Sequence, residues 1–146
     1  MTPTTTAMLE IFKDRPDIRT FFNILHDINQ TADGIADGDI DPKEGIGKLL
    51  WAACVALPSD PFFAAYKSSL LPVMAGAIIS WDASNKWGHE DGQAHAFAFV
   101  RRWDLEMLIP VVAGLVNGYD GARVANEKYF RAARLEQPDD LATWRP

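Results

Sequence analysis

The sequence contains a single cysteine, Cys54, so no disulfide can form within the chain. A chain without disulfides suits a reducing compartment, and we expect the protein to be cytoplasmic. Its Thr-rich start, residues 1–7, lacks the basic residues and apolar core of a signal peptide. The uncharged stretch 68–81 is shorter than the roughly 20 apolar residues that span a bilayer. We therefore predict no membrane segment, and Cys54, inside the apolar run 49–57, is expected to be buried.

Motifs of known catalytic chemistry are also missing. No His-Glu-x-x-His pair of a zinc hydrolase is present. Asp37, Asp39 and Asp41 alternate as the first ligands of a calcium loop would, but Pro42 occupies the position that requires glycine. Lys48 stands where the loop needs a bidentate acid. Helix capping is the better interpretation of these acids, and we expect no cofactor.

Composition favours one packed globule. Hydrophobic residues make up 48% of the 146-residue chain, with five Trp and eight Phe. We expect one helical domain over residues 1–146, with residues 1–13 and 137–146 as loosely ordered tails. The net charge of −6 disfavours nucleic acid and anionic membranes as partners of this acidic protein.

An aspartate with a proline one or two positions after it marks the first three expected helix starts, because the carboxylate caps free amides and proline is tolerated in the first turn. The first helix is predicted to begin near Asp14 and to end before an acidic loop at 31–40. The second begins at Pro42 and is apolar nearly all round, so we expect it to be central and buried. The third begins at Pro61 and reaches Trp81.

Two further helices complete the prediction. One spans residues 97–117 and ends at Gly118, and the last begins at Asp120 and stops before Pro138. Pro72 and Pro110 fall inside predicted helices and are expected to bend them. The sequence thus predicts an all-α array or bundle of about five helices, two of them proline-kinked.

Residues 70–82 resemble residues 108–120 at an offset of 38 positions. A period of this size would suit a repeated helical hairpin. Chance similarity between two helices rich in Ala, Val, Leu and Gly is the favoured explanation, because the match does not extend upstream. The repeat therefore stays an open alternative.

The polar segment 81–95 carries most of the side chains that could perform chemistry. His89, Asp91 and His95 are candidate metal ligands, since imidazole and carboxylate suit Zn, Mn or Fe, and Asp82 could join them. Asp91 and His95 are four residues apart and would share one face of a helix. The competing interpretation is a cluster of solvated or capping groups.

Charged residues also interrupt the apolar sequence that follows. Arg101 is spaced to pair with Asp104, and Arg102 with Glu106, on a helix surface. Alternatively, one arginine is buried against a polar side chain of the preceding helix. The candidate binding residues that follow from these patterns are Trp81, Asp82, Asn85, Trp87, Arg101 and Arg102.

Two functions of different class fit the sequence. The first is a helical binding protein, such as an accessory or inhibitory partner of a larger complex, whose partner is another protein or a second copy. The second is a metal-dependent hydrolase or ligand-binding enzyme using residues 82–95. The sequence leaves open whether the protein is an enzyme.

Overall fold

A computed structural model describes residues 1–136 and 140–146. The chain is all-helical, with 82% of residues in helices and no strand among those described, which confirms the predicted fold class. It forms two compact units: unit 1 comprises Met1–Lys13 and Ser68–Pro146, and unit 2 comprises Asp14–Lys67. Whether the two units make one domain stays a prediction.

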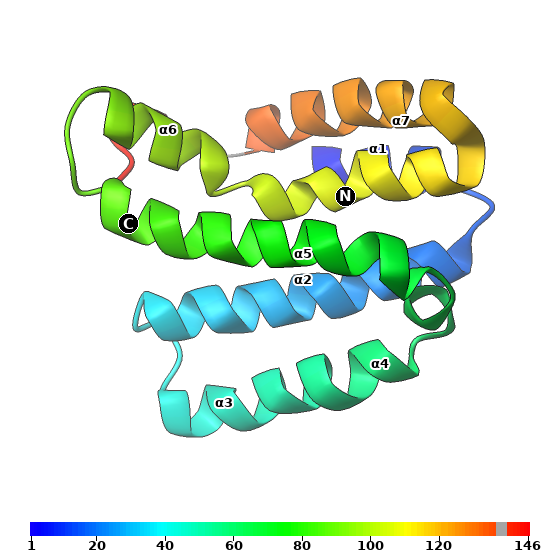
Figure 1. Cartoon of the computed structure of the whole chain (residues 1–146), viewed down its shortest axis with the longest axis horizontal. Helices are drawn as coiled ribbons and strands as arrows, with labels where there is room; N and C mark the ends of the chain where they lie inside the picture. The colour runs from blue at the N-terminus through cyan, green and yellow to red at the C-terminus, as the bar shows by residue number, and fades with distance from the viewer. Residues whose placement is uncertain (137–139) are drawn as a thin grey trace. The chain divides into compact units, whose positions relative to one another are not determined.

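Unit 2 is built from α2 (Pro16–Ala36), α3 (Pro42–Trp51), a π-helical segment η1 (Ala52–Ala56), the short α4 (Leu57–Ser59) and the start of α5 (Pro61–Trp87). Helices α2 and α3 pack against each other (Figure 1). The Phe21 ring is buried and lies 5.4 Å from Phe62 and 6.3 Å from Phe63 between ring centroids. Aromatic packing between α2 and α5 is thus a main part of this core.

The predicted helix starts at Asp41 and Asp60 are confirmed by their capping bonds. Asp41 Oδ1 accepts from Lys43 N at 2.8 Å, and Asp60 Oδ1 accepts from Phe63 N at 2.8 Å. The start predicted near Asp14 lies two residues before the observed first residue, Pro16, and the N-cap residue is Arg15, whose side chain makes no capping bond. The acidic loop at 31–40 is also shorter than predicted, since α2 continues to Ala36.

The prediction that the second helix is central and buried is wrong. Within α3 only Gly45 is buried, and Cys54 of η1 is exposed rather than buried. A compact unit of about 50 residues has too few elements to surround a helix that is apolar on every side. The apolar residues that do not face α2 therefore remain in contact with solvent.

Unit 1 contains α1 (Pro3–Ile11), the remainder of α5, α6 (Gln93–Arg101), a 3-10 segment η2 (Asp104–Met107) and α7 (Leu108–Glu136). Helix α1, in the part expected to be a loose tail, lies along α7 (Figure 1). Thr4 N donates to Glu136 Oε1 at 3.0 Å, and Lys128 pairs with Glu10. The most deeply buried apolar side chains of this unit are Leu70, Ala98, Leu108, Val112, Ala113 and Ala125.

The predicted helix over 97–117 is interrupted. Helix α6 ends at Arg101, and α7 begins only at Leu108, after the 3-10 segment. Pro110 is thus the third residue of α7, where the missing amide hydrogen would have no helical acceptor, so no kink is required there. The predicted break at Gly118 is confirmed, because this residue has φ 71° and ψ −170° inside α7. The expected end of the last helix at Pro138 lies outside the described residues.

Candidate interaction surfaces

The ends of α5 and α6 hold most of the predicted binding residues. Arg102 Nη1 donates to Asn85 Oδ1 at 3.2 Å, which joins two residues 17 positions apart. Asp82 instead pairs with Lys86 at 3.0 Å, one turn along α5, and both side chains are exposed. Trp81 is half-buried. The sequence left two partners open for the arginines, an acid on the same helix or a polar side chain of the preceding helix. Arg102 has a partner of the second kind, Asn85.

Arg101 connects three elements of unit 1. Its Nη2 lies 2.5 Å from Oγ of the buried Ser80, and its Nε lies 2.9 Å from Asp104 Oδ2. The guanidinium also lies over the Phe97 ring, 5.7 Å from the centroid. These contacts fix the arginine head while part of the side chain stays accessible, a suitable arrangement for an interface arginine.

The three candidate metal ligands have different environments. His95 is buried, with Nδ1 2.8 Å from Gly88 O and Nε2 2.9 Å from Leu141 O. His89 and Asp91 are exposed. Among the residues that the structure describes, no three His, Cys, Asp or Glu side chains gather closely enough to hold a metal ion. The hydrolase alternative gains no support from this geometry.

His95 instead anchors the end of the chain, which sequence reasoning placed in a loose tail. Trp144 is 4% exposed, and its ring centroid lies 5.4 Å from that of His95 and 5.6 Å from that of Phe99. The guanidinium of Arg102 lies 5.6 Å from the same indole. A Cβ built on Gly88 would stand 2.7 Å from Trp144 Cη2, so only glycine allows this approach.

Asp140 holds the turn that precedes the buried Trp144. Its Oδ1 accepts from the amides of Thr143 and Ala142, each at 2.9 Å. These bonds, with that of the Thr143 amide the strongest, hold the pKa of the Asp140 carboxyl below its ordinary value. The residues before Asp140, 137–139, lie outside the described part of the chain.

An exposed aromatic cluster lies beside these internal contacts. Trp87 at the end of α5 is 41% exposed, and Phe97 and Val100 on α6 are 53% and 64% exposed. The rings of Trp87 and Phe97 lie 5.9 Å apart between centroids, and Arg101 covers one side of Phe97. We call Trp87, Phe97, Val100 and Arg101 the hairpin cluster. Trp87 and Arg101 were predicted from the sequence, whereas Phe97 and Val100 were expected on a helix face and not as a site.

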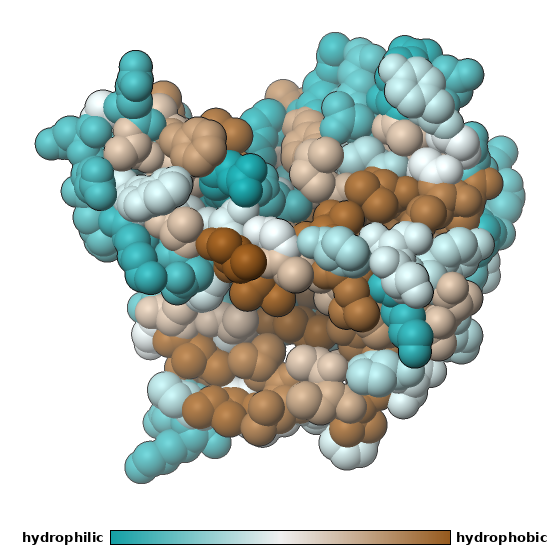
Figure 2. Space-filling model, viewed as in Figure 1, coloured by the Kyte–Doolittle hydropathy of each residue, from teal (hydrophilic) through white to brown (hydrophobic). Residues whose placement is uncertain are grey.

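A second exposed apolar surface lies on unit 2, which sequence reasoning missed by treating its helix as core. The side chains of Ile46, Leu50, Trp51 and Val55 are 48%, 56%, 67% and 39% exposed. Figure 2 shows apolar residues gathered over α3 and the segment that follows it. We call these four residues the α3 face. An apolar run without charge does not reveal from sequence alone whether a partner inside the chain covers it.

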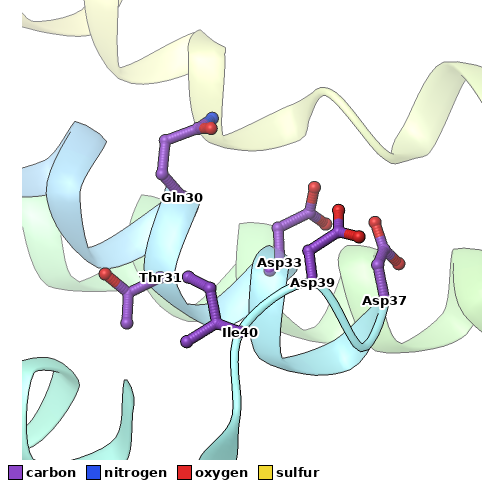
Figure 3. Close-up of a pocket in the computed structure, with 7 residues that line it drawn as sticks. Gln30, Thr31, Asp33, Asp37, Asp39 and Ile40 are labelled. Carbon is purple, nitrogen blue, oxygen red and sulfur yellow. The ribbon is translucent and has the colours of Figure 1, made fainter. Parts of the chain in front are cut away.

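The turn between α2 and α3 forms an acidic pocket of about 300 Å³. It is lined by Gln30, Thr31, Asp33, Gly34, Asp37, Asp39 and Ile40. Figure 3 shows the three carboxylates gathered on one side of the turn. Two glycines allow this tight turn. Gly38 has φ 81°, and Gly34 lies so close to Ile40 that a Cβ on it would stand 2.7 Å from Ile40 Cδ1.

In unit 1, one half-buried acid with a buried carboxylate oxygen lies where η2 meets α7. Glu106 was expected to pair with Arg102 at the surface, but its Oε2 has no hydrogen-bond partner. Burial raises the pKa of this carboxyl to about 7, although Arg134 lowers it in part. The indole Nε1 of Trp103 is likewise buried without a partner, and the Arg134 guanidinium lies 5.2 Å from the Trp103 ring centroid.

Comparison with known proteins adds no family to this description. No protein-family model, curated protein or solved structure matches the chain.

Proposed function

We propose that this chain is a helical interaction protein that binds another protein through the hairpin cluster. The observation that carries the proposal is the exposed pair of Trp87 and Phe97 beside a fixed Arg101. Trp and Arg are enriched among the residues that dominate binding energy at interfaces, and exposed aromatic groups rarely gather on a surface without a partner.

The internal contacts support this role. Arg101 is held by Ser80 and Asp104, and its neighbour Arg102 by Asn85, so the cluster stands on a supported hairpin. A side chain that is ordered before binding loses less entropy when a partner arrives. The cluster is therefore suited to recognition by shape and aromatic contact.

Overall charge supports a protein as the ligand. The net charge of −6 opposes phosphate backbones and anionic lipid headgroups. A single cysteine is compatible with the cytoplasm, where we place the protein. By length and composition α5 could cross a bilayer, and 22% of its apolar window is buried in this structure; the buried core helix of a water-soluble protein meets the same test of length and composition.

A bend in α5 at Pro72 is part of the same proposal. Proline offers no amide hydrogen to the carbonyl of Ser68, which favours a bend in the helix that carries Trp87. Pro72→Ala is expected to straighten α5 and to shift backbone NMR signals beyond residue 72. Shifts confined to the first neighbours of residue 72 would argue against the bend.

Site-specific photo-crosslinking tests the function. A photoreactive phenylalanine analogue at position 97 is expected to give one discrete covalent adduct in cells that make the protein naturally. The same group at the exposed Asp91 is the matched control and is expected to give none. Excess wild-type protein should suppress the adduct, and excess Phe97→Ser protein should not.

The mass of the adduct distinguishes a different protein from a second copy. No adduct at position 97, or the same adducts at positions 97 and 91, would contradict the proposed function.

A further inference from the structure

The α3 face leaves four large apolar side chains in solvent within ten residues. Leu50 and Trp51 are more than half exposed, and Ile46 and Val55 flank them along the helix. No charged residue occurs from position 49 to position 59, and Lys48 is the one charged residue between Ile46 and Val55, so this segment has few ionic groups to hydrate it. A continuous apolar surface of this kind favours burial against a partner.

The backbone of this segment is also unusual. Residues Ala52–Ala56 form a π-helical turn, whose i→i+5 hydrogen bonds are rare and occur mostly where a helix carries function. Leu50 and Val55 are five residues apart, so the wider turn brings them closer to one line than a regular α-helix would. The π turn thus helps to form a continuous apolar row with Ile46.

Strong negative charge adjoins the N-terminal end of this row. Residues 33–44 carry five carboxylates and one lysine, a net charge of −4 in a chain of net charge −6. Three of these carboxylates, on Asp33, Asp37 and Asp39, line the acidic pocket of the α2–α3 turn (Figure 3). An occupant of the α3 face that extends past the start of α3 meets this negative turn.

We propose that the α3 face binds an amphipathic helix of a partner protein whose apolar side covers Ile46, Leu50, Trp51 and Val55 and whose basic end reaches the acidic α2–α3 turn. An amphipathic helix offers apolar side chains at the spacing of a helical row, and its lysines or arginines complement the carboxylates. The α3 face belongs to unit 2, whereas the residues of the hairpin cluster belong to unit 1.

Charge complementarity selects this occupant over others. An anionic membrane would be repelled by the acidic turn at the end of the row. If a second copy packed its α3 face in a parallel orientation, two turns of net charge −4 would face each other. In an antiparallel orientation, each acidic turn would face an uncharged helix end. Only a basic partner neutralises the turn.

A synthetic helix provides the test. The probe is an 18-residue peptide with Leu and Phe along one side and Lys at one end, which as a helix is about 27 Å long. Its binding is measured by fluorescence anisotropy of a dye on the peptide. The control peptide has Glu in place of every Lys.

Variants of exposed residues locate the binding. Leu50→Ser with Trp51→Ser is expected to weaken binding at least about tenfold. Asp37→Asn with Asp39→Asn should weaken it about threefold or more and reduce its dependence on salt. Ile78→Ser with Ile79→Ser, at exposed positions of α5 in unit 1, is the matched control and should bind as the wild type does.

Four results would overturn the inference. The first is binding of the Glu peptide as tight as that of the Lys peptide. The second is peptide binding by the α3 variant as tight as that by the α5 control. The third is retention of the wild type, but not of the α3 variant, on phosphatidylglycerol vesicles, which would identify a lipid surface as the occupant of the α3 face. The fourth is a doubled mass of the wild type in light scattering, with a monomeric α3 variant and no peptide binding, which would identify a second copy as the occupant.

Discussion

Arg134 Nη2 lies 3.8 Å from Glu106 Oε2, too far for a hydrogen bond. The attraction is therefore weak, and desolvation of the buried carboxylate prevails over it, so that the pKa of Glu106 rises to about 7. A carboxyl whose pKa is higher in the folded protein than in the unfolded chain stabilises the fold at low pH. That contribution is complete below the ordinary pKa of 4.5 and is lost as the pH rises through about 7.

Glu106→Gln is thus expected to stabilise the protein at pH 8 by up to about 3 kcal/mol and to change little near pH 4.5. Urea unfolding at a series of pH values measures both effects. Glu127→Gln, which removes an exposed acid paired with Arg131 at 3.0 Å, is the control and should show no such pH dependence. Equal stabilisation by Glu106→Gln at both pH values would contradict the assignment.

Trp144→Ala is expected to release the end of the chain. Losing a buried indole costs several kcal/mol in a core, but a tail can detach alone, which limits the loss of stability to about 3 kcal/mol. Hydrogen exchange should accelerate at residues 140–146 and at the amides around Gly88. Trp51→Ala removes the same side chain from an exposed position and should leave exchange in this region unchanged. Unchanged exchange in the Trp144 variant would mean that the tail does not depend on the indole.

Gly118→Ala is expected to destabilise the fold by about 1–2 kcal/mol, because an L-residue with a side chain disfavours a φ of 71°. Gly76 provides the opposite case inside α5, where a Cβ meets no atom within 4 Å. Gly76→Ala should stabilise by about 0.5–1 kcal/mol through helix propensity. Thermal unfolding of both variants checks the signs, and a stabilising Gly118→Ala would show that the joint in α7 is not required.

Asp60→Ala should cost about 1–2 kcal/mol, because it leaves the buried Phe63 amide without its acceptor. Asp41→Ala removes the same kind of cap from an exposed helix end, where water can replace it, and should cost about 0.5–1 kcal/mol. Urea unfolding compares the two variants. A larger loss of unfolding free energy in the Asp41 variant than in the Asp60 variant would contradict the expectation that the buried cap contributes more.

Helix starts were predictable from the sequence because capping is local. Asp41 and Asp60 bond amides two and three residues away, and Gly118 breaks its helix through its own dihedral angles. The start near Asp14 was two residues early, because Arg15 stands between this aspartate and Pro16 and occupies the capping position. Local signals therefore gave the order of the helices from α2 onwards, with errors of several residues at their ends, but they missed α1, in the expected N-terminal tail.

The candidate site was less predictable because it depends on contacts between distant residues. His95 and Leu141 are 46 positions apart, and no spacing rule relates them. Burial of the second helix failed for a related reason, since the apolar pattern of α3 does not say how many neighbours will cover it. Trp87 and Arg101 were predicted from the sequence as binding residues, but their exposure and their link through Phe97 required the structure.

The exposed Cys54 on the π-helical turn has a practical consequence. With one thiol per chain, air oxidation can join two molecules and never three. Such a covalent pair would press two α3 faces together and block them. Protein purified without a reductant would thus lose capacity for the probe peptide in proportion to its oxidised fraction, and dithiothreitol would restore it.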